Sequence, residues 1–462
     1  MQDTALDTAR LDQLIADAYP EMERDLLALL ACASVEGEGT ADAPFGPEVA
    51  RALATALNIC QELGLSTCNV DGYCGFADLP GAEAEQVGVL AHLDVVPARP
   101  EDWTYPPFTP TVVGDTIYGR GAMDDKGPLL AALYGLKALM DLGFKPRKTV
   151  RVIMGCNEET HMACMKHYLS KYAPPACGFT PDADWPLIVG EKGIIHYELT
   201  SAWPPASGDG PRLLSLECGS AANVVPAKAA AVLLNWNAPA TLPEGISLSR
   251  EGAATVVLAQ GTAAHASTPT EGDNALTKLV RFLADQDFAP GGAKNFICAL
   301  AHLYADDLFG ASMGLAGEDE RSRTTQAPTM CRLDEEGACL TCDLRFLLTQ
   351  TSDHYLPIIR QAAANWGLTL GGYDCHEPLW LGEEHPLASI LLDSYRQVTG
   401  DMTEPLVIGG GTYAKIFPNF LAFGPEPHDK PNLAHQADER ITKQQLIEAA
   451  RIYARALYAL AK

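Results

Sequence analysis

The stretch QVGVLAHLDVV at residues 86–96 is a strand-like apolar run, and a second one, KTVRVIMGCNEE, follows at residues 148–159. Between them, GPLLAALYGLKALMDLG at residues 127–143 has the length and apolar content of a helix. Strands that alternate with helices in this way predict a parallel sheet that is covered by helices. We therefore expect an α/β fold for residues 1–187.

The pattern changes after VGEKG at residues 189–193. Short alternating runs such as IIHYELTSAW and GACLTCDLRF are separated there by connections rich in Gly, Pro and Ala. This texture predicts an α+β insertion over residues 188–383. The α/β pattern resumes with HPLASILLDSYRQVTG and a closing helix at 441–460, so residues 384–462 should complete the domain that residues 1–187 begin.

The composition is that of a globular protein large enough for two domains, with 462 residues, of which 47% are hydrophobic and 20% charged. A net charge of -26 disfavours binding to nucleic acid or to anionic membrane surfaces. We find no run long enough to cross a membrane and no pattern of a secretory signal. Thirteen cysteines, an odd number, fit a reducing compartment better than a disulfide framework. We therefore expect a cytoplasmic protein.

Two polar residues, His92 and Asp94, end the first strand-like run. Residues two apart on a strand face the same side, and open α/β sheets bind ligands at the carboxyl ends of their strands. A histidine and a carboxylate at that edge could bind a metal ion, or they could be a hydrogen-bonded pair in the core.

Four acids and a second histidine are further candidates for the same site. Asp124 precedes the predicted helix and could also cap it, whereas Glu158 and Glu159 end the second strand-like run and could also be solvated loop acids. Asp182 lies in a proline-bounded turn, and His435 lies far downstream. Carboxylates and histidines without cysteine form a nitrogen and oxygen site that suits Zn²⁺, Mn²⁺ or Co²⁺.

These residues lie in motifs similar to those of the zinc exopeptidases that include aminoacylases, glutamate carboxypeptidases and succinyl-diaminopimelate desuccinylase, and especially to the dipeptidase V branch. The resemblance implies a zinc-exopeptidase (phosphorylase/hydrolase-like) α/β catalytic domain, residues 1–187 and 384–462, with an inserted α+β lid domain, residues 188–383. Its motifs follow the family's order: HLDVVP at 92–97, GRGAMDDKGP at 119–128, NEE at 157–159, FTPDADWP at 179–186, VGEKG at 189–193, NVVP at 223–226, GGGTYAK at 409–415 and AHQADERI at 434–441.

The resemblance implies two divalent metal ions in each chain, in the first instance Zn²⁺, with Mn²⁺ or Co²⁺ as alternatives. Asp124 would bridge both ions. His92 and Asp182 would complete one site, and Glu159 and His435 would complete the other.

Catalytic roles follow from the same positions. Glu158 would be the general base, and Asp94 would orient His92 through the ring nitrogen that does not face the metal. The resemblance also implies a cis peptide bond between Asp124 and Asp125.

A set of substrate-binding residues is implied as well. Asn223 and His265 would hold the oxygen of the scissile carbonyl. A clamp on the substrate's terminal carboxylate would consist of Arg345 and the backbone of Gly409, Gly410, Gly411 and Thr412. Without the resemblance, these residues would be interpreted as a turn asparagine, a surface histidine, a strand-edge arginine and a flexible glycine loop.

The implied function is a metal-dependent dipeptidase that cleaves unblocked dipeptides and is active as a monomer. Asp125 favours a dipeptidase over a deacylase, whereas Lys415 departs from the family's usual arginine. The alternative within the family is an N-acyl amino acid amidohydrolase or carboxypeptidase. A rival from another class is a binding module without catalysis, against which the intact Glu158 argues.

Overall fold

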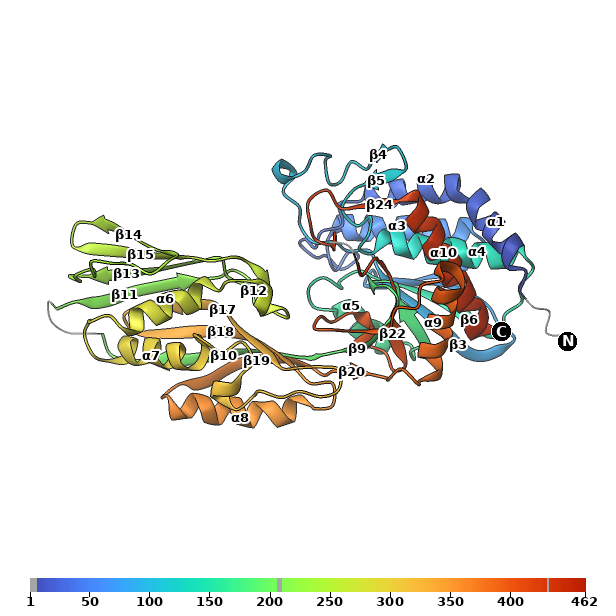
Figure 1. Cartoon of the computed structure of the whole chain (residues 1–462). Helices are drawn as coiled ribbons and strands as arrows, with labels where there is room; N and C mark the ends of the chain where they lie inside the picture. Colours follow the sequence, from blue (N-terminus) through green and yellow to red (C-terminus); the bar gives the residue numbers. More distant parts are fainter. Residues whose placement is uncertain (1–5, 206–209, 430–431) are drawn as a thin grey trace. The chain divides into compact units, whose positions relative to one another are not determined.

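The computed structural model describes residues 6–205, 210–429 and 432–462. The chain forms two compact units (Figure 1). The first comprises Met1–Gly190, Leu381–Leu406 and Gly411–Lys462, and the second comprises Glu191–Trp380 and Val407–Gly410. The domain limits at 187/188 and 383/384 remain predictions about which parts of the chain fold independently.

The first unit is built on a mixed sheet with the strand order β1-β2-β6-β3-β7-β22-β9. At its centre, β3 pairs in parallel with β6 and β7, and β22 pairs in parallel with β7. The strands are β1 (Ser66–Val70), β2 (Cys74–Leu79), β3 (Glu83–His92), β6 (Lys148–Gly155), β7 (Cys177–Thr180), β9 (Ile188–Glu191) and β22 (Phe420–Ala422). The predicted α/β fold is therefore confirmed, with antiparallel pairs added toward both edges.

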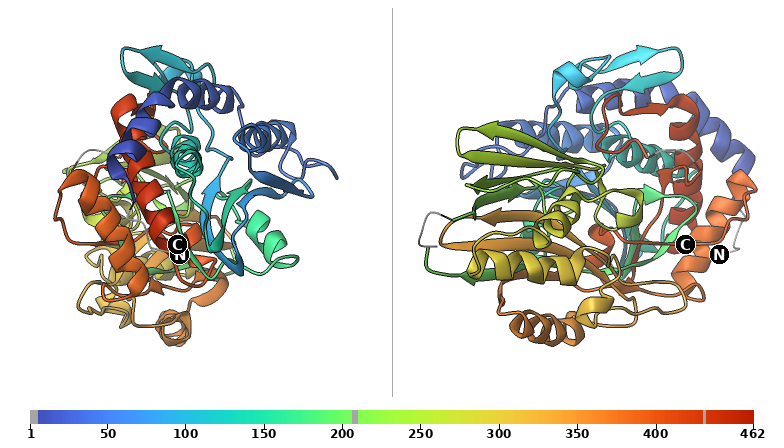
Figure 2. Two further views of the ribbon diagram at one scale, coloured as in Figure 1. Left: turned by 90° about the vertical axis from the view of Figure 1, so that its right-hand side faces the viewer. Right: turned by 60° about the vertical axis from the view of Figure 1, so that its left-hand side comes forward.

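Helices cover this sheet, and α4 and α10 lie side by side against β3 and β6 (Figure 2). The helices of the unit are α1 (Thr8–Asp17), α2 (Tyr19–Leu30), α3 (Pro47–Glu62), α4 (Lys126–Asp141), α5 (Ala163–Leu169), α9 (Pro386–Thr399) and α10 (Lys443–Ala461). The predicted helices at 127–143 and 441–460 are confirmed as α4 and α10. Helix α10 begins with a capping box of Thr442 and Gln445, in which side chains satisfy backbone N–H groups of the first turn.

Two small sheets hold loops of the first unit together. The strands β4 (Thr111–Val113), β5 (Thr116–Tyr118) and β24 (Arg440–Thr442) form one of them, with β24 antiparallel to β5. The other joins β8 (Ala183–Asp184) to β23 (Pro425–Glu426). Segments that are far apart in the sequence, near residues 118 and 440, are therefore neighbours in space.

The second unit is α+β, as predicted. Its sheet has the order β14-β15-β13-β11-β17-β18-β10-β19, and the apolar side chains of α6, α7 and α8 join those of the sheet in one core. Its main elements are β10 (Gly193–Ala202), β11 (Arg212–Cys218), β13 (Lys228–Leu234), β14 (Ile246–Glu251), β15 (Ala254–Gln260), α6 (Ala275–Ala284), α7 (Gly292–Tyr304), β17 (Thr325–Leu333), β18 (Gly337–Phe346), α8 (Ser352–Asn365) and β19 (Thr369–His376). A separate ribbon pairs β12 (Val224–Val225) with β16 (Ala264–His265).

The chain passes back to the first unit after β20 (Leu379–Trp380), and β21 (Leu406–Ile408) adjoins the short return of residues 407–410 to the second unit. Within the described ranges, we find no helix with the length and apolar character needed to span a membrane. All thirteen cysteines are free thiols.

Candidate active site

Neighbouring parallel strands of the first unit deliver the candidate metal ligands to one edge of the sheet. β3 ends at His92, which is in register with Gly155, the last residue of β6. Glu158 and Glu159 follow β6, and Asp182 follows β7 on the other side of β3. This edge is formed by the carboxyl ends of the parallel strands, where open α/β sheets bind their ligands.

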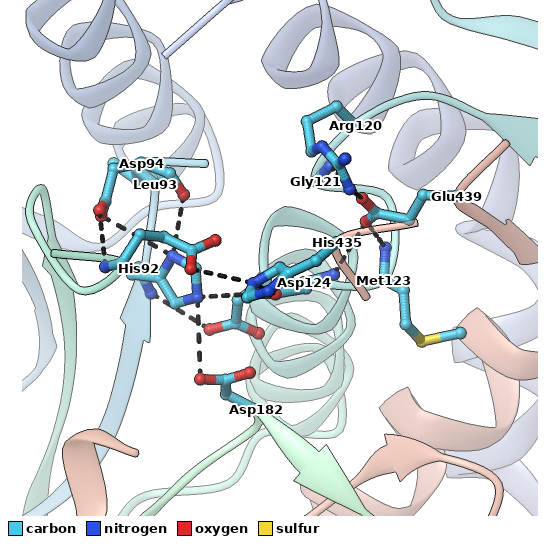
Figure 3. A network of polar contacts seen from close by, with 12 residues as sticks. His92, Leu93, Asp94, Arg120, Gly121, Met123, Asp124, Asp182, His435 and Glu439 are labelled. Atoms are coloured by element: carbon cyan, nitrogen blue, oxygen red, sulfur yellow. Dashed lines mark hydrogen bonds and ion pairs between the residues drawn. The ribbon is translucent and has the colours of Figure 1, made fainter. Parts of the chain in front are cut away.

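Asp124 lies between the two histidines. Its Oδ1 is 2.8 Å from Nε2 of His92, and its Oδ2 is 3.0 Å from Nε2 of His435 (Figure 3). Asp182 Oδ2 is 3.7 Å from His92 Nε2, and Glu159 Oε2 is 3.0 Å from His435 Nε2. All five predicted metal ligands are thus brought together, in two groups that share Asp124.

The polar atoms of His92 and Asp124 fit a bound cation. His92 Nδ1 lies 2.9 Å from the backbone carbonyl of Asp94, which can only accept, so Nδ1 carries the proton. In the neutral ring Nε2 then presents a lone pair, and it faces another lone-pair atom, Oδ1 of Asp124. Both atoms are buried and neither makes a hydrogen bond. A divalent ion coordinated by nitrogen and carboxylate oxygen would satisfy both.

The donor atoms also cluster closely enough for metal coordination. Among the described residues, one set of donor atoms within 4.8 Å of one another comes from His92, Glu158 and Asp182, and another from His92, Asp124 and Glu159. The residues present therefore fit the divalent ions that the resemblance implies.

The electrostatics show how much negative charge is concentrated here. Burial, together with the neighbouring Asp124 carboxylate, raises the pKa of Asp182 to about 7. Burial likewise raises the pKa of Glu158 well above its usual range. Burial also favours the neutral form of Asp124, but the adjacent His435 and His92 side chains outweigh it and hold that pKa below its usual value. Bound cations would compensate the same charges.

Asp94 is buried and supports both sides of the centre. Its carbonyl oxygen fixes the His92 ring, while its carboxylate Oδ1 is 3.7 Å from His92 Nδ1. The carboxylate Oδ2 accepts a 3.0 Å hydrogen bond from the backbone N–H of Glu159. Nδ1 of His92 is therefore closer to the main-chain carbonyl of Asp94 than to the Asp94 carboxylate.

Asn223 and His265 come together in the second unit. β12 is antiparallel to β16, and the N–H of Ala266 donates a 2.8 Å hydrogen bond to the carbonyl of Asn223. His265 Nδ1 accepts from the backbone N–H of Ser267 at 3.2 Å and lies 2.6 Å from the Ser267 hydroxyl. Because Nδ1 accepts, the neutral ring carries its proton on Nε2, which is the form that can donate to a carbonyl oxygen.

Arg345 is 3% exposed and is held by Asp343. The two side chains form a bidentate pair, with Nε and Nη2 of Arg345 at 2.7 and 2.6 Å from the carboxylate. Nη1 donates a 2.6 Å hydrogen bond to the carbonyl of Gly409. Arg345 and Gly409 are thus in contact within the second unit.

The rest of the glycine loop is divided between the units. Gly410 belongs to the second unit, whereas Gly411 and Thr412 belong to the first. Thr412 Oγ1 accepts a 3.1 Å hydrogen bond from the N–H of Ala414, which starts a short helical turn.

Several buried polar residues near the predicted sites were not among the predicted site residues. Asp125 is fully buried and accepts a 3.1 Å hydrogen bond from the N–H of His92, and its peptide bond with Asp124 is cis, as the resemblance implied. Glu439 is fully buried beside Asp124, and Asp343 is fully buried beside Arg345. The only sequence signal for them is that each is an acid within or next to a motif, which does not distinguish a buried acid from an exposed one.

Comparison with known proteins identifies the class. Residues 88–459 match the model of peptidase family M20/M25/M40, and the chain belongs to this family. The predicted family, hydrolase class and metallopeptidase activity are thereby confirmed.

Individual relatives cover almost the whole chain. A putative dipeptidase of Staphylococcus epidermidis is 34% identical over 95% of this chain and 97% of its own length. A β-Ala-Xaa dipeptidase of Lactobacillus delbrueckii subsp. lactis is 33% identical over 95% of this chain and 96% of its own length. The structure of human carnosine dipeptidase 1 is 16% identical, has a TM-score of 0.58 and covers 98% of this chain and 99% of that one, which shows a common fold.

Proposed function

We propose that this protein is a dinuclear metal-dependent dipeptidase that hydrolyses unblocked dipeptides with Glu158 as the general base. One observation carries the proposal: the two carboxylate oxygens of Asp124 face different histidines, His92 at 2.8 Å and His435 at 3.0 Å. A carboxylate placed in this way can bridge two ions, one with His92 and Asp182 and the other with Glu159 and His435. The dipeptidase function agrees with the names of relatives that are 33 to 34% identical over 95% of the chain.

Divalent ions bound there would polarise the peptide carbonyl and lower the pKa of a water molecule toward neutrality. Glu158 would take the proton of that water and deliver it to the departing amine. Its carboxyl group lies among the donor atoms that include His92 and Asp182, which suits a role beside the reacting water. Asp94 would keep His92 and the backbone of Glu159 in place.

The residues of the second unit would bind substrate. His265, in the tautomer with the proton on Nε2, would donate to the carbonyl oxygen together with Asn223. Arg345 has five N–H donors. Among the described residues, two of them bond Asp343 and one bonds Gly409, so the other two could bind a substrate carboxylate. The N–H groups of Gly409, Gly410, Gly411 and Thr412 would complete the carboxylate clamp.

Three further features belong to the proposal. Zn²⁺ is the proposed metal, with Mn²⁺ or Co²⁺ as alternatives, because the ligands are nitrogen and carboxylate oxygen only. The protein is proposed to be cytoplasmic and to act as a monomer. Its substrates are proposed to be small peptides rather than proteins, nucleic acids or membranes.

A panel of substrates tests the proposal. Metal-reconstituted protein should cleave diverse unblocked dipeptides and should cleave tripeptides and N-acetyl amino acids at least tenfold more slowly. Both termini of a dipeptide would be gripped at once, and a third residue would bury a charged terminus without a partner, at a cost of several kcal/mol. Arg345→Ala should raise KM strongly. Faster turnover of N-acyl amino acids than of every dipeptide would establish the alternative, an N-acyl amino acid amidohydrolase or carboxypeptidase.

A further inference from the structure

Glu439 lies four residues after His435 and is 0% exposed, yet it is not one of the proposed ligands. Its carboxylate accepts four hydrogen bonds. Oε1 accepts from the backbone N–H groups of Met123 at 2.8 Å and Asp124 at 3.1 Å. Oε2 accepts from Nη1 of Arg120 at 2.7 Å and from the N–H of Gly121 at 3.1 Å (Figure 3). One side chain therefore fixes the whole turn that presents Asp124.

We propose that Glu439 is a positioning residue that couples the Asp124 turn to the His435 loop and thereby sets the affinity for the ion that Asp124 and His435 would share. The inference rests on the proposed function, because it assumes that these two residues bind the same ion. Asp124 Oδ2 and His435 Nε2 are 3.0 Å apart but belong to segments separated by about three hundred residues of sequence. Glu439 is the link that joins the backbones of the two segments next to these atoms.

The loop around Glu439 is anchored on both sides, so a shift of one segment must move the other. The N–H of Gly119 donates a 3.0 Å hydrogen bond to the carbonyl of Glu439, and β24 begins at the next residue, where Arg440 pairs with Tyr118. Asp438 accepts from the N–H and the hydroxyl of Thr104 at 2.8 and 2.7 Å.

Backbone conformation shows that the surroundings determine the shape of this loop. His435 and Asp438 have φ values of 63° and 58°, in the left-handed region that non-glycine residues rarely adopt. Such conformations persist where neighbouring contacts over-determine them. The contacts of Asp438 and Glu439 with the 104 and 120–124 segments are of this kind, and they hold the imidazole of His435 against Asp124.

A carboxylate is required at position 439 because all four of its partners are donors. In glutamine, one oxygen becomes an NH₂ group, which would face two N–H donors in either orientation and leave them unsatisfied. Arg120 also balances the charge, so Glu439 adds no unpaired negative charge beside Asp124. Glu439→Gln should therefore disturb the turn while keeping nearly the same volume.

The test measures metal affinity and not only activity. Purified Glu439→Gln and the parent are equilibrated with Zn²⁺ or Co²⁺ in chelator buffers of graded free-metal concentration, and bound metal is determined by elemental analysis. We expect the ion that Asp124 and His435 would share to bind about 10- to 100-fold less tightly in the variant, the range found for residues that support ligands, so that one of the two binding steps moves to higher free metal. The absorption bands of bound Co²⁺ should change as well, because the geometry of its ligands changes.

Asp78→Asn is a matched control. Asp78, like Glu439, pairs with a buried arginine of the first unit, here through two hydrogen bonds of 2.8 and 2.7 Å from Arg151, but it contacts no proposed ligand. The substitution Asp78→Asn should lower the melting temperature and leave the metal affinity and the Co²⁺ spectrum unchanged. If Glu439→Gln does not fold, Arg120→Gln removes one of the four donors and should weaken metal binding in the same direction by a smaller factor.

The inference would be overturned if Glu439→Gln folds and binds both ions as tightly as the parent. If Glu439→Gln does not fold, the same result for Arg120→Gln would overturn it. The parent tests the proposed function separately. If the parent binds fewer than two ions under saturating conditions, the dinuclear proposal fails, whereas the effect of Glu439 is still read from the change in affinity between parent and variant.

Discussion

Adjacent side chains in the centre have different neighbours. Glu159 lies 3.0 Å from His435, whereas the donor set of Glu158 is formed with His92 and Asp182. Adjacent residues at the end of a strand diverge, so one glutamate can hold a metal while the next faces the reacting water. The backbone at this point is held by Asp94, whose carboxylate accepts a hydrogen bond from the N–H of Glu159.

Glu158→Gln should therefore keep both metal ions and lose at least a factor of about 10² to 10⁴ in kcat, because it removes the general base and not a ligand. Elemental analysis and steady-state kinetics on a dipeptide measure the two effects. Glu159→Gln is the matched control and should lose the ion that it shares with His435. Metal loss in Glu158→Gln with full retention in Glu159→Gln would mean that the two roles are reversed.

Asp343→Asn should weaken the carboxylate clamp. Asp343 is fully buried and aligns the guanidinium of Arg345 through two short hydrogen bonds, and such charged bonds contribute about 1.5 to 3 kcal/mol. We expect KM for dipeptides to rise roughly tenfold or more, with kcat and metal content little changed. Asp374→Asn, which alters an exposed pair with His376, is the control. A fall in kcat at constant KM would contradict the positioning role.

At the scale of elements, Gly409 packs closely against Ser267, which follows strand β16 in the second unit. A Cβ atom at Gly409 would lie 2.6 Å from Cβ of Ser267, which contacts the ring of His265, whereas the nearest neighbour of a Cβ at Gly410 would be Ile408 at 3.7 Å. The first contact is too short for any real side chain, and the second is ordinary. The approach of the two segments therefore requires glycine at position 409 but not at position 410.

Gly409→Ala should push Ser267 and the loop apart and lower kcat/KM by roughly tenfold or more, since overpacking of this kind costs about 1 to 3 kcal/mol. Gly410→Ala should remain close to the parent. Steady-state kinetics of both variants, with metal content measured in parallel, make the comparison. Equal activities of the two variants would show that the contact with Ser267 does not matter for substrate binding.

For the whole molecule, removal of metal should lower stability. The metal centre concentrates Asp124, Glu158, Glu159 and Asp182 in a partly buried site. A ligand that binds only the folded state adds about 2.7 kcal/mol at a concentration 100 times its Kd. We expect chelator-treated protein to melt at a lower temperature and to recover on addition of Zn²⁺. Glu158→Gln should respond to chelator as the parent does, whereas an unchanged melting temperature in the parent would contradict tight metal binding.

The proposed monomer is a second property of the whole chain. The resemblance implies that the large inserted lid supplies within one chain what a partner subunit supplies in smaller relatives, and here His265 and Arg345 lie in that second unit. Light scattering at working concentration should give the mass of one chain. A mass twice that value, together with loss of activity on dilution, would show that a partner is required.

Much of the fold and the ligand set could be predicted from local patterns. The alternation of apolar runs and helices depends on neighbours within a few residues, and it correctly predicted β3, α4, β6 and α10. Because parallel strands end at one edge, the same pattern predicted that His92 and Glu158 would meet, whereas Asp182 and His435 were assigned to the site by the family resemblance. The sequence alone therefore determined the class of the fold and the type of metal site.

Only the tertiary structure decided which groups support that site. The carbonyl of Asp94, and not its carboxylate, fixes His92, and Glu439 fixes the turn of Asp124 across about three hundred residues of sequence. Arg345 is bound to Asp343 and to the carbonyl of Gly409. The type of a residue determines which hydrogen bonds its side chain can make. Its actual partner depends on long-range packing, because packing determines which donors and acceptors are buried together.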